Sequence, residues 1–188
     1  SVLCGLYHPD EGTIEVEDQR VEFRSPRDAI SRGIGIVHQH FMLVPSLTVW
    51  ENLVLGSKDL PFVVNEDAIC ERIKDLSQRY GLDVDPSAPI WTLSIGEQQR
   101  VAILRMLYHE AKILILDEPT SVLTPQEIEH LFSTIKHMKK EGYGIIFISH
   151  KLKEVFEISD RITVLRRGKV VGSLNAREAT PEMLAEMM

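Results

Sequence analysis

Four consecutive aliphatic residues at positions 113–116 are followed at once by two carboxylates, Asp117 and Glu118. A short, uninterrupted aliphatic run is typical of a strand that is buried on both faces, as the strands of parallel sheets are. Residues 144–148 form a second such run after one helix-length segment, and residues 33–37 form another earlier in the chain. Buried strands that alternate with helical segments predict an α/β sandwich built around a parallel sheet.

Two antiparallel hairpins are expected beside this sheet. Residues 12–24 alternate apolar and polar side chains about a polar turn at residues 18–20. Residues 162–171 show the same alternation about a turn at residues 166–168. Short alternating runs around such turns predict hairpins with one face buried.

The other segments have helical apolar spacing. Residues 45–108 form a helical block, which we interpret as an insertion between strands. A capping box of Thr124 and Glu127, with Pro125 at the first helical position, predicts a helix that runs to about Lys140. Breaks in the block are expected at Gly56, at Pro61 and between residues 83 and 89, and shorter helices are expected at residues 27–32, at residues 153–159 and from Thr180 onward.

Composition excludes several classes of protein. The chain has 188 residues, enough for one domain or for one domain with a small subdomain. Its net charge of −7 gives no electrostatic footprint for nucleic acid or for anionic lipid. Cys4 and Cys70 have no motif spacing, which favours free thiols in a reducing cytosol over a disulfide or a metal pair. No apolar run approaches the roughly 18 residues expected of a membrane span, and no signal peptide is visible.

Asp117 and Glu118 emerge together at the end of the first strand, where parallel sheets place their ligands. Asp117 is suited to hold Mg²⁺, directly or through water, because that ion prefers oxygen ligands. Glu118 points differently and could polarise a water molecule for phosphoryl transfer. The alternative is an ordinary strand end followed by a proline turn.

Two further polar residues follow buried strands. His150 could donate a hydrogen bond to a γ-phosphate oxygen, although a lone histidine at a strand end is more often structural. Gln39 could reach Mg²⁺ or the attacking water, or simply face solvent. A metal site that used both His38 and His40 would need a distorted backbone, because alternate residues of an extended segment point in opposite directions.

The segment LSIGEQQR, residues 93–100, opens a run with helical apolar spacing. Ser94 and Glu97 have the spacing of a capping box, in which each side chain satisfies a backbone N–H at the helix start. The same helix start could instead present its N–H groups and the Ser94 hydroxyl to a phosphate. The two devices are compatible if the capping box leaves Gly96 and its neighbours facing outward.

These pieces together resemble an ATP-binding cassette (ABC) ATPase, over essentially the whole chain. Gln39 resembles the Q-loop glutamine, and Ser94, Ile95, Gly96 and Glu97 lie in a segment that resembles the signature motif. Asp117 matches the Walker B aspartate, and Glu118 matches the catalytic glutamate. Residues 121–124 resemble the D-loop, and His150 resembles the switch histidine. The amino-acid sequence of residues 33–56, 119–127 and 147–172 is similar to that of the amino-terminal cassette of tandem ATPases that serve simple-sugar and nucleoside importers.

The resemblance implies a P-loop NTPase-type α/β sandwich with a helical subdomain and antiparallel β hairpins. Residues 1–44 would form part of the ATPase core lobe and end in the Q-loop, residues 45–107 the helical signature subdomain, and residues 108–188 the remainder of the core lobe. ATP and Mg²⁺ would be the cofactors, with Asp117 and Gln39 as the metal ligands. Glu118 and His150 would be catalytic, whereas Gln39, Ser94, Ile95, Gly96, Glu97 and Asp117 would contact the nucleotide and its ion.

It also implies partners and a place in the cell. Two cassettes would close head to tail on ATP, so that the signature of one faces the γ-phosphate held by the other. Transmembrane permease subunits would dock near the Q-loop and the helical insertion, and a substrate-binding protein would take part indirectly. The expected location is the cytoplasmic face of the plasma membrane, as a peripheral subunit, and no nucleic-acid partner is expected. The alternatives are an ABC-type ATPase without a transport role and a non-catalytic cassette that only donates its signature motif.

The sequence departs from the family pattern in one large respect. No G-x-x-x-x-G-K-[ST] segment occurs in the 188 residues. In the family this phosphate loop precedes the helix whose end residues 1–5 resemble, so we expect the chain to be a fragment and the loop to lie just upstream of Ser1. Smaller departures are Glu97 where glutamine is common and Thr124 where many relatives have aspartate.

We therefore expect the isolated 188-residue chain neither to bind ATP tightly at its own site nor to hydrolyse it. The physical reason is the lack of the backbone N–H cradle and the lysine that hold the phosphates. Isothermal titration of the folded chain with Mg²⁺-ATP measures the affinity. A dissociation constant in the nanomolar to low micromolar range would contradict this expectation.

Overall fold

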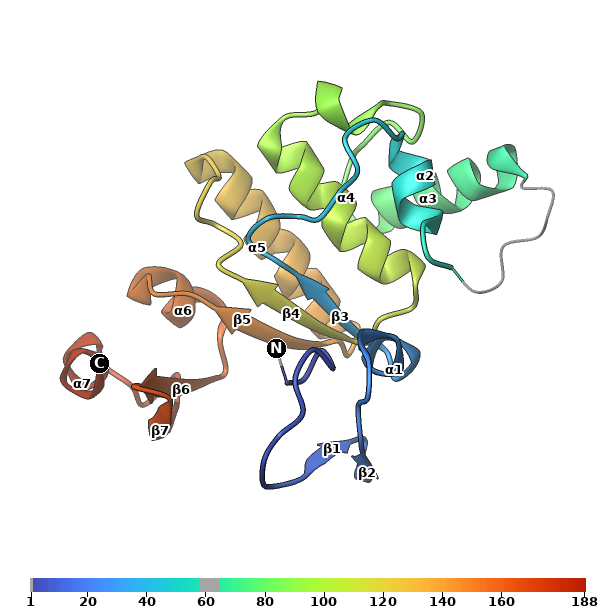
Figure 1. Cartoon of the computed structure of the whole chain (residues 1–188). Coiled ribbons are helices and arrows are strands. Elements are labelled where there is room, and N and C mark those ends of the chain that lie inside the picture. The colour runs from blue at the N-terminus through green and yellow to red at the C-terminus, as the bar shows by residue number, and fades with distance from the viewer. Residues whose placement is uncertain (1, 58–64) are drawn as a thin grey trace.

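Three parallel strands lie at the centre of the fold: β3 (Ile34–Val37), β4 (Ile113–Asp117) and β5 (Gly144–Ile148), in the order β3-β4-β5. In their register Val37 is opposite Leu116, and Leu116 is opposite Phe147. The computed structural model describes residues 2–57 and 65–188. Figure 1 shows the sheet below a layer of helices, so the α/β arrangement predicted from the sequence is confirmed.

Helices cover one face of this sheet. The helices α4 (Ile95–Tyr108) and α5 (Pro125–Lys140) lie over the strands, and α2 (Val49–Val54) and α3 (Glu66–Tyr80) pack against α4 (Figure 1). A single 3₁₀ turn at Ile90–Thr92 precedes α4. The helical block expected at residues 45–108 is therefore confirmed where it is described, and the break expected at Pro61 lies outside the described residues.

The remaining elements flank the sheet. One hairpin pairs β1 (Ile14–Val16) with β2 (Gln19–Val21), and another pairs β6 (Arg161–Arg166) with β7 (Lys169–Asn175). Both hairpins were expected, but the first turn lies at Glu17 and Asp18 rather than at residues 18–20. Both turn residues have positive φ, as a two-residue loop needs if its twist is to match that of the strands. Three short helices complete the chain: α1 (Pro26–Ser31), α6 (Leu152–Ile158) and α7 (Pro181–Met187).

The strand β4 is buried on both faces, as its aliphatic run predicts. Leu114 and Leu116 belong to the main core beneath the helices. Ile115 belongs to a second core on the opposite face of the sheet, and Ile113 packs against that core. The second core also contains Cys4, Val21, Phe23, Ala29 and Ile34, which come from the first 34 residues of the chain.

The prediction that β5 is buried on both faces is wrong. Ile145 and Phe147 pack against the main core, but Ile146 and Ile148 are 40% and 44% exposed. The reason is positional, because β5 pairs only with β4 among the described strands and the second core covers β3 and β4 alone. An aliphatic run shows that a strand is apolar, and the layers around it decide how many of its faces are covered.

The interpretation of residues 1–5 as the end of a helix stays a prediction, because the described residues there make only one turn. Residues 2–5 form a turn in which Gly5 N–H donates to the Val2 carbonyl oxygen at 2.9 Å. Gly5 has a φ of 70°, and a Cβ there would overlap the Ser25 carbonyl. The glycine is therefore required both by its positive φ and by the close approach of two backbones. In the part of the chain that the structure describes, no helix is long and apolar enough to cross a membrane.

Replacing Leu104 by alanine should destabilise the fold strongly, because Leu104 is fully buried at the centre of α4 in the main core. The cavity should lower the free energy of unfolding by about 2–5 kcal/mol. The same truncation at Leu165, which is 69% exposed on β6, should change it by less than about 0.5 kcal/mol. Urea denaturation followed by circular dichroism measures both, and equal losses would contradict this account of the core.

Candidate functional site

Four of the sequence-predicted site residues lie where the parallel strands end. Asp117 is the last residue of β4 and Glu118 follows it, while Gln39 and His150 each come two residues after β3 and β5. Because the three strands are parallel and in register, their carboxyl ends meet at one edge of the sheet. Open α/β sheets bind their ligands at this edge.

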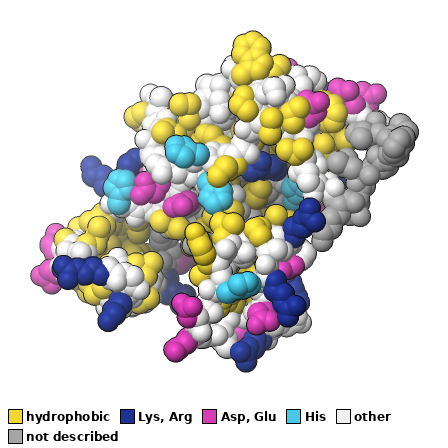
Figure 2. Space-filling model, viewed as in Figure 1, with side chains coloured by type: hydrophobic (Ala, Val, Ile, Leu, Met, Phe, Trp, Pro, Cys, Tyr) yellow, Lys and Arg dark blue, Asp and Glu magenta, His cyan; other side chains and the backbone are white. Residues whose placement is uncertain are grey.

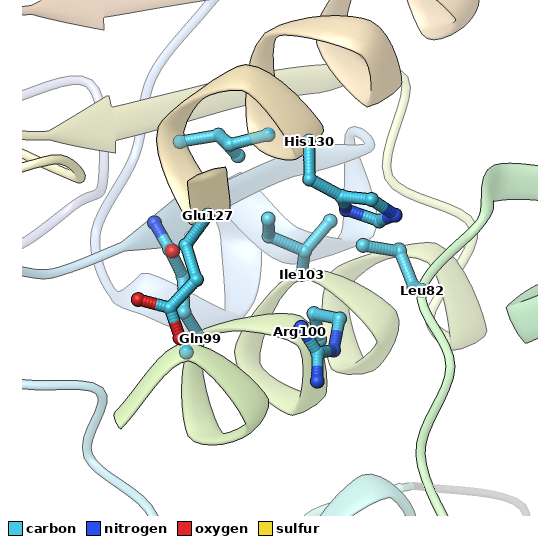
Figure 3. A pocket seen from close by; sticks show the side chains of 8 residues that line it. Leu82, Gln99, Arg100, Ile103, Glu127 and His130 are labelled. Carbon is cyan, nitrogen blue, oxygen red and sulfur yellow. The ribbon is translucent and has the colours of Figure 1, made fainter. Parts of the chain in front are cut away.

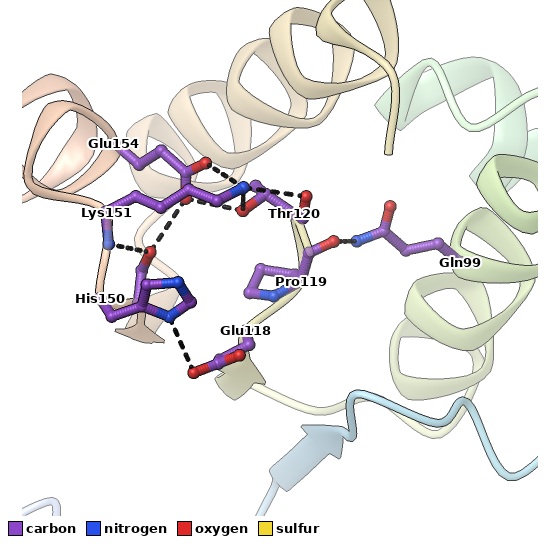
Figure 4. Close-up of polar contacts among 8 residues, drawn as sticks. Gln99, Glu118, Pro119, Thr120, His150, Lys151 and Glu154 are labelled. Carbon is purple, nitrogen blue, oxygen red and sulfur yellow. Dashed lines mark hydrogen bonds and ion pairs between the residues drawn. The ribbon is translucent and has the colours of Figure 1, made fainter. Parts of the chain in front are cut away.

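Glu118 and His150 are in direct contact. Glu118 Oε1 lies 3.0 Å from His150 Nδ1. A dashed line marks this contact in Figure 4. Their side chains are 35% and 65% exposed, so the pair is open to solvent and to a ligand. Glu118 has a φ of 47°, an uncommon backbone conformation for a residue with a side chain, and its N–H donates to the Ile148 carbonyl oxygen at 2.9 Å. Such conformations persist where the surroundings impose them, and they cluster at functional sites.

Asp117 and Gln39 offer oxygen ligands of the kind that Mg²⁺ uses. Asp117 is half-buried and Gln39 is exposed, at the ends of two neighbouring strands. Among residues 2–57 and 65–188, no group of three or more His, Cys, Asp and Glu side chains could hold a metal ion, which also leaves His38 and His40 without a metal set. A carboxylate and an amide fit Mg²⁺, because this ion usually keeps several waters and takes its other ligands from substrate phosphates.

The capping box at the start of α4 is confirmed. Ser94 N–H and Ser94 Oγ donate to Glu97 Oε2 at 2.8 Å and 2.7 Å, and Glu97 N–H donates to Ser94 Oγ at 3.3 Å. The Ser94 hydroxyl and amide hold the pKa of the Glu97 carboxyl below its usual range, because both donate to the ionised form. Glu97 is therefore the anion that this helix start already holds.

Gly96 is not open to an anion in the way that the sequence interpretation expected. It is buried, and a Cβ on it would overlap Glu127 Oε1. Glu127 forms the capping box of α5 with Thr124, whose amide and hydroxyl lower the pKa of the Glu127 carboxyl. Figure 3 shows Glu127 of α5 pointing at the first turn of α4, beside Gln99. At this helix start the exposed residues are Ser94 and Ile95.

A polar network behind Glu118 and His150 is the part that sequence reasoning missed. Glu154 Oε2 accepts from Thr120 Oγ1 at 2.7 Å and from Ser149 Oγ at 3.0 Å, and Glu154 Oε1 lies 3.1 Å from Lys151 Nζ (Figure 4). Gln99 of α4 donates from Nε2 to the Pro119 carbonyl oxygen at 2.7 Å. Glu154 lies one helical turn before the buried Ile158, on the same face of α6. An acidic residue on an apolar helix face indicates a buried polar contact, and this pattern is the sequence signal that points to Glu154.

The loop that follows Gln39 borders an open groove. Arg105 of α4 donates to the Met42 carbonyl oxygen at 3.0 Å, and Asn52 of α2 accepts from Val44 N–H at 2.7 Å. Burial lowers the pKa of the Arg105 guanidinium. The groove has a volume of about 320 Å³, and its lining includes Gln39, Phe41, Trp91, Ile95, Gln98 and Val122. Hydrophobic side chains also gather over the helical part of the face shown in Figure 2.

Comparison with known proteins identifies relatives of the whole chain. The model of the ABC transporter family matches residues 1–121. The guanosine import ATP-binding protein NupO of Bacillus subtilis is 47% identical, and the glucose import ATP-binding protein TsgD13 of Haloferax volcanii is 44% identical. Each match covers 100% of this chain, but the chain spans only 37% and 39% of the length of these two relatives.

Solved structures of ABC cassettes have the same fold. The cbiO1 protein of Clostridium perfringens, part of the ABC transporter complex cbiONQ, is 28% identical with a TM-score of 0.78, over 94% of this chain and 71% of that one. The ADP conformation of MJ1267, an ATP-binding cassette of an ABC transporter, is 22% identical with a TM-score of 0.82, over 99% of this chain and 80% of that one. These similarities confirm the predicted fold class.

Replacing Gly96 by alanine should destabilise the chain, because the added methyl group displaces Glu127 from the start of α5. Overpacking of this kind costs about 1–3 kcal/mol of unfolding free energy. The control is Gly144→Ala, where the new Cβ would meet its nearest neighbour at an ordinary 3.5 Å. In a Glu127→Ala background the same change at Gly96 should cost less. Thermal and urea unfolding measure the stability of each variant. An equal loss of unfolding free energy from Gly96→Ala with and without Glu127→Ala would contradict the contact.

Proposed function

Because the chain belongs to the ABC transporter family, we propose that it acts in an ATP-hydrolysing subunit that powers import of a simple sugar or a nucleoside through a membrane permease. The observation that carries the proposal is the contact between Glu118 Oε1 and His150 Nδ1, at the sheet edge that also presents Asp117. The substrate class rests on relatives whose names state glucose, guanosine and ribose import.

Each residue at the sheet edge has a chemical role in this proposal. Bound Mg²⁺-ATP supplies the phosphoryl group and a cation that offsets the charge of the phosphates. Asp117 and Gln39 would hold that cation through their oxygens. Glu118 orients a water molecule and accepts its proton at the carboxylate, because it carries the free acceptor oxygens next to the cation site. His150 fixes the carboxylate through Nδ1, and an imidazole that carries both ring protons would also donate from Nε2 to a phosphate oxygen.

The start of α4 serves a second cassette in this proposal. Ser94 and Ile95 are exposed there, whereas Gly96 allows the close contact with Glu127. The first N–H groups of a helix have no partner within the helix, and they can donate to a phosphate that another molecule holds. Glu97 keeps this turn in the geometry that presents those groups. Two cassettes closing head to tail would place each signature segment at the other's ATP.

We assign the docking of transmembrane permease subunits to the groove beside Gln39. Apolar side chains from the loop, from the turn before α4 and from residues 121–124 line it, and Met42 and Trp91 are 69% and 70% exposed. The division into residues 1–44, 45–107 and 108–188 remains our proposal for the lobes that move on closure. Such docking would place the protein at the cytoplasmic face of the plasma membrane, with a substrate-binding protein acting through the permease.

Replacing Glu118 by glutamine should lower the rate of ATP hydrolysis by the complete protein that contains these residues. Loss of the proton acceptor should reduce kcat about 100-fold, which is about 2.7 kcal/mol of activation free energy. Glu129→Gln, an exposed glutamate on α5, is the matched control and should leave kcat unchanged. Phosphate release measures turnover, and a variant that keeps steady-state hydrolysis would remove Glu118 from the mechanism.

A further inference from the structure

Side-chain contacts join the loops after β4 and β5 on an exposed side and on a buried side. On the exposed side, Glu118 contacts His150. On the buried side, Glu154 accepts hydrogen bonds from Thr120 of one loop and from Ser149 of the other. Thr120 lies two residues after Glu118, and Ser149 directly precedes His150. The two loops and Glu154 therefore form a closed ring of contacts, with Glu154 at one end and the Glu118–His150 pair at the other (Figure 4).

Glu154 is a buried carboxylate whose charge is compensated. The residue is 7% exposed, and Lys151 Nζ lies 3.1 Å from its Oε1. Lys151 Nζ also donates to the Thr120 carbonyl oxygen at 3.2 Å. A buried charge is tolerated only with such partners, and removing one partner leaves the others unsatisfied. The carboxylate thus sets the separation of Thr120 and Ser149 more firmly than an apolar side chain could.

We propose that Glu154 is a positioning residue, whose carboxylate holds the loops of Glu118 and His150 at the separation that brings this pair into contact. The proposal deepens the function proposed above and rests on it. In addition to these side-chain contacts, a backbone hydrogen bond joins the two loops, from Glu118 N–H to the Ile148 carbonyl oxygen. That bond fixes where the loops begin, and Glu154 fixes them further on.

Gln99 extends the same ring to α4. Its side chain is 3% exposed and donates to the Pro119 carbonyl oxygen, between Glu118 and Thr120. A shift of α4 therefore acts on the loop that carries Glu118, at the carbonyl group of the next residue, Pro119. Through this hydrogen bond, α4 is connected directly to the loop that carries Glu118 at the sheet edge.

The test replaces Glu154 by glutamine in the complete protein. Glutamine keeps the shape and one acceptor oxygen for the two hydroxyls, but it leaves Lys151 Nζ without its carboxylate. We expect kcat for ATP to fall about tenfold, with KM for ATP changed less than twofold, because the Glu154 side chain is buried and its carboxylate is taken up by Thr120 and Ser149. In the double variant Glu154→Gln/Lys151→Met, which also removes the ammonium that has lost its carboxylate, kcat should recover by at least threefold.

Two controls separate positioning from loss of stability. Glu157→Gln changes an exposed glutamate on the same helix, whose ion pair is with Lys136, and should leave kcat unchanged. Met138→Ala opens a cavity in the main core on α5 and should lower the melting temperature at least as much as Glu154→Gln does, with kcat retained. If Met138→Ala lowered kcat equally, or if Glu154→Gln left kcat at the wild-type value, the proposal would be wrong.

A spectroscopic measurement on the 188-residue chain tests the positioning without turnover. The imidazole nitrogen signals of His150 report its contact with Glu118, and Glu154→Gln should shift them more than Glu157→Gln does. Unchanged His150 signals would overturn the role of Glu154. Complete protein that fails to hydrolyse ATP would overturn the proposed function instead, and the His150 signals would still decide the positioning.

Discussion

The pairing of β4 between β3 and β5 is the constraint on which the rest of the structure depends. Both faces of β4 are covered, by the main core on one side and by the second core on the other. A strand fixed on both edges and on both faces ends at a fixed point, so Asp117 and Glu118 leave the sheet in a defined direction. Gln39 and His150 acquire their places from the same register, although 111 positions separate them in the sequence, from 39 to 150.

Register alone leaves the loops beyond the strand ends undetermined. The positive φ of Glu118 shows that the backbone turns sharply there, and side chains have to hold that turn. Thr120, Ser149 and Lys151 do so by converging on Glu154, and Gln99 holds the intervening Pro119 carbonyl. The exposed contact of the site is thus built on a buried one, which is how a rigid scaffold positions polar groups that must meet a ligand.

Sequence reasoning predicted the features that local chemistry determines. The aliphatic run before Asp117 and the capping boxes of Ser94 with Glu97 and of Thr124 with Glu127 need only neighbours within a few residues. It failed where the determinant is a layer or a partner far along the chain. The exposure of β5 depends on what the second core covers, the burial of Gly96 depends on Glu127, and the role of Glu154 depends on two loops that approach each other in three dimensions.

The two capping boxes also limit what the start of α4 can offer to an anion. Glu97 already takes the Ser94 amide and hydroxyl, and Glu127 stands against Gly96 in the neighbouring helix. The pKa of each of these carboxyls is lowered by its own capping partners, so both are ionised at neutral pH and repel a phosphate. A phosphate at this helix start has to use the N–H groups of the first turn that the capping box leaves free, and the Ser94 hydroxyl only if it turns away from Glu97. In the function that we propose, this helix start would therefore favour a phosphate whose charge is already offset by a bound cation, as that of the γ-phosphate of Mg²⁺-ATP is.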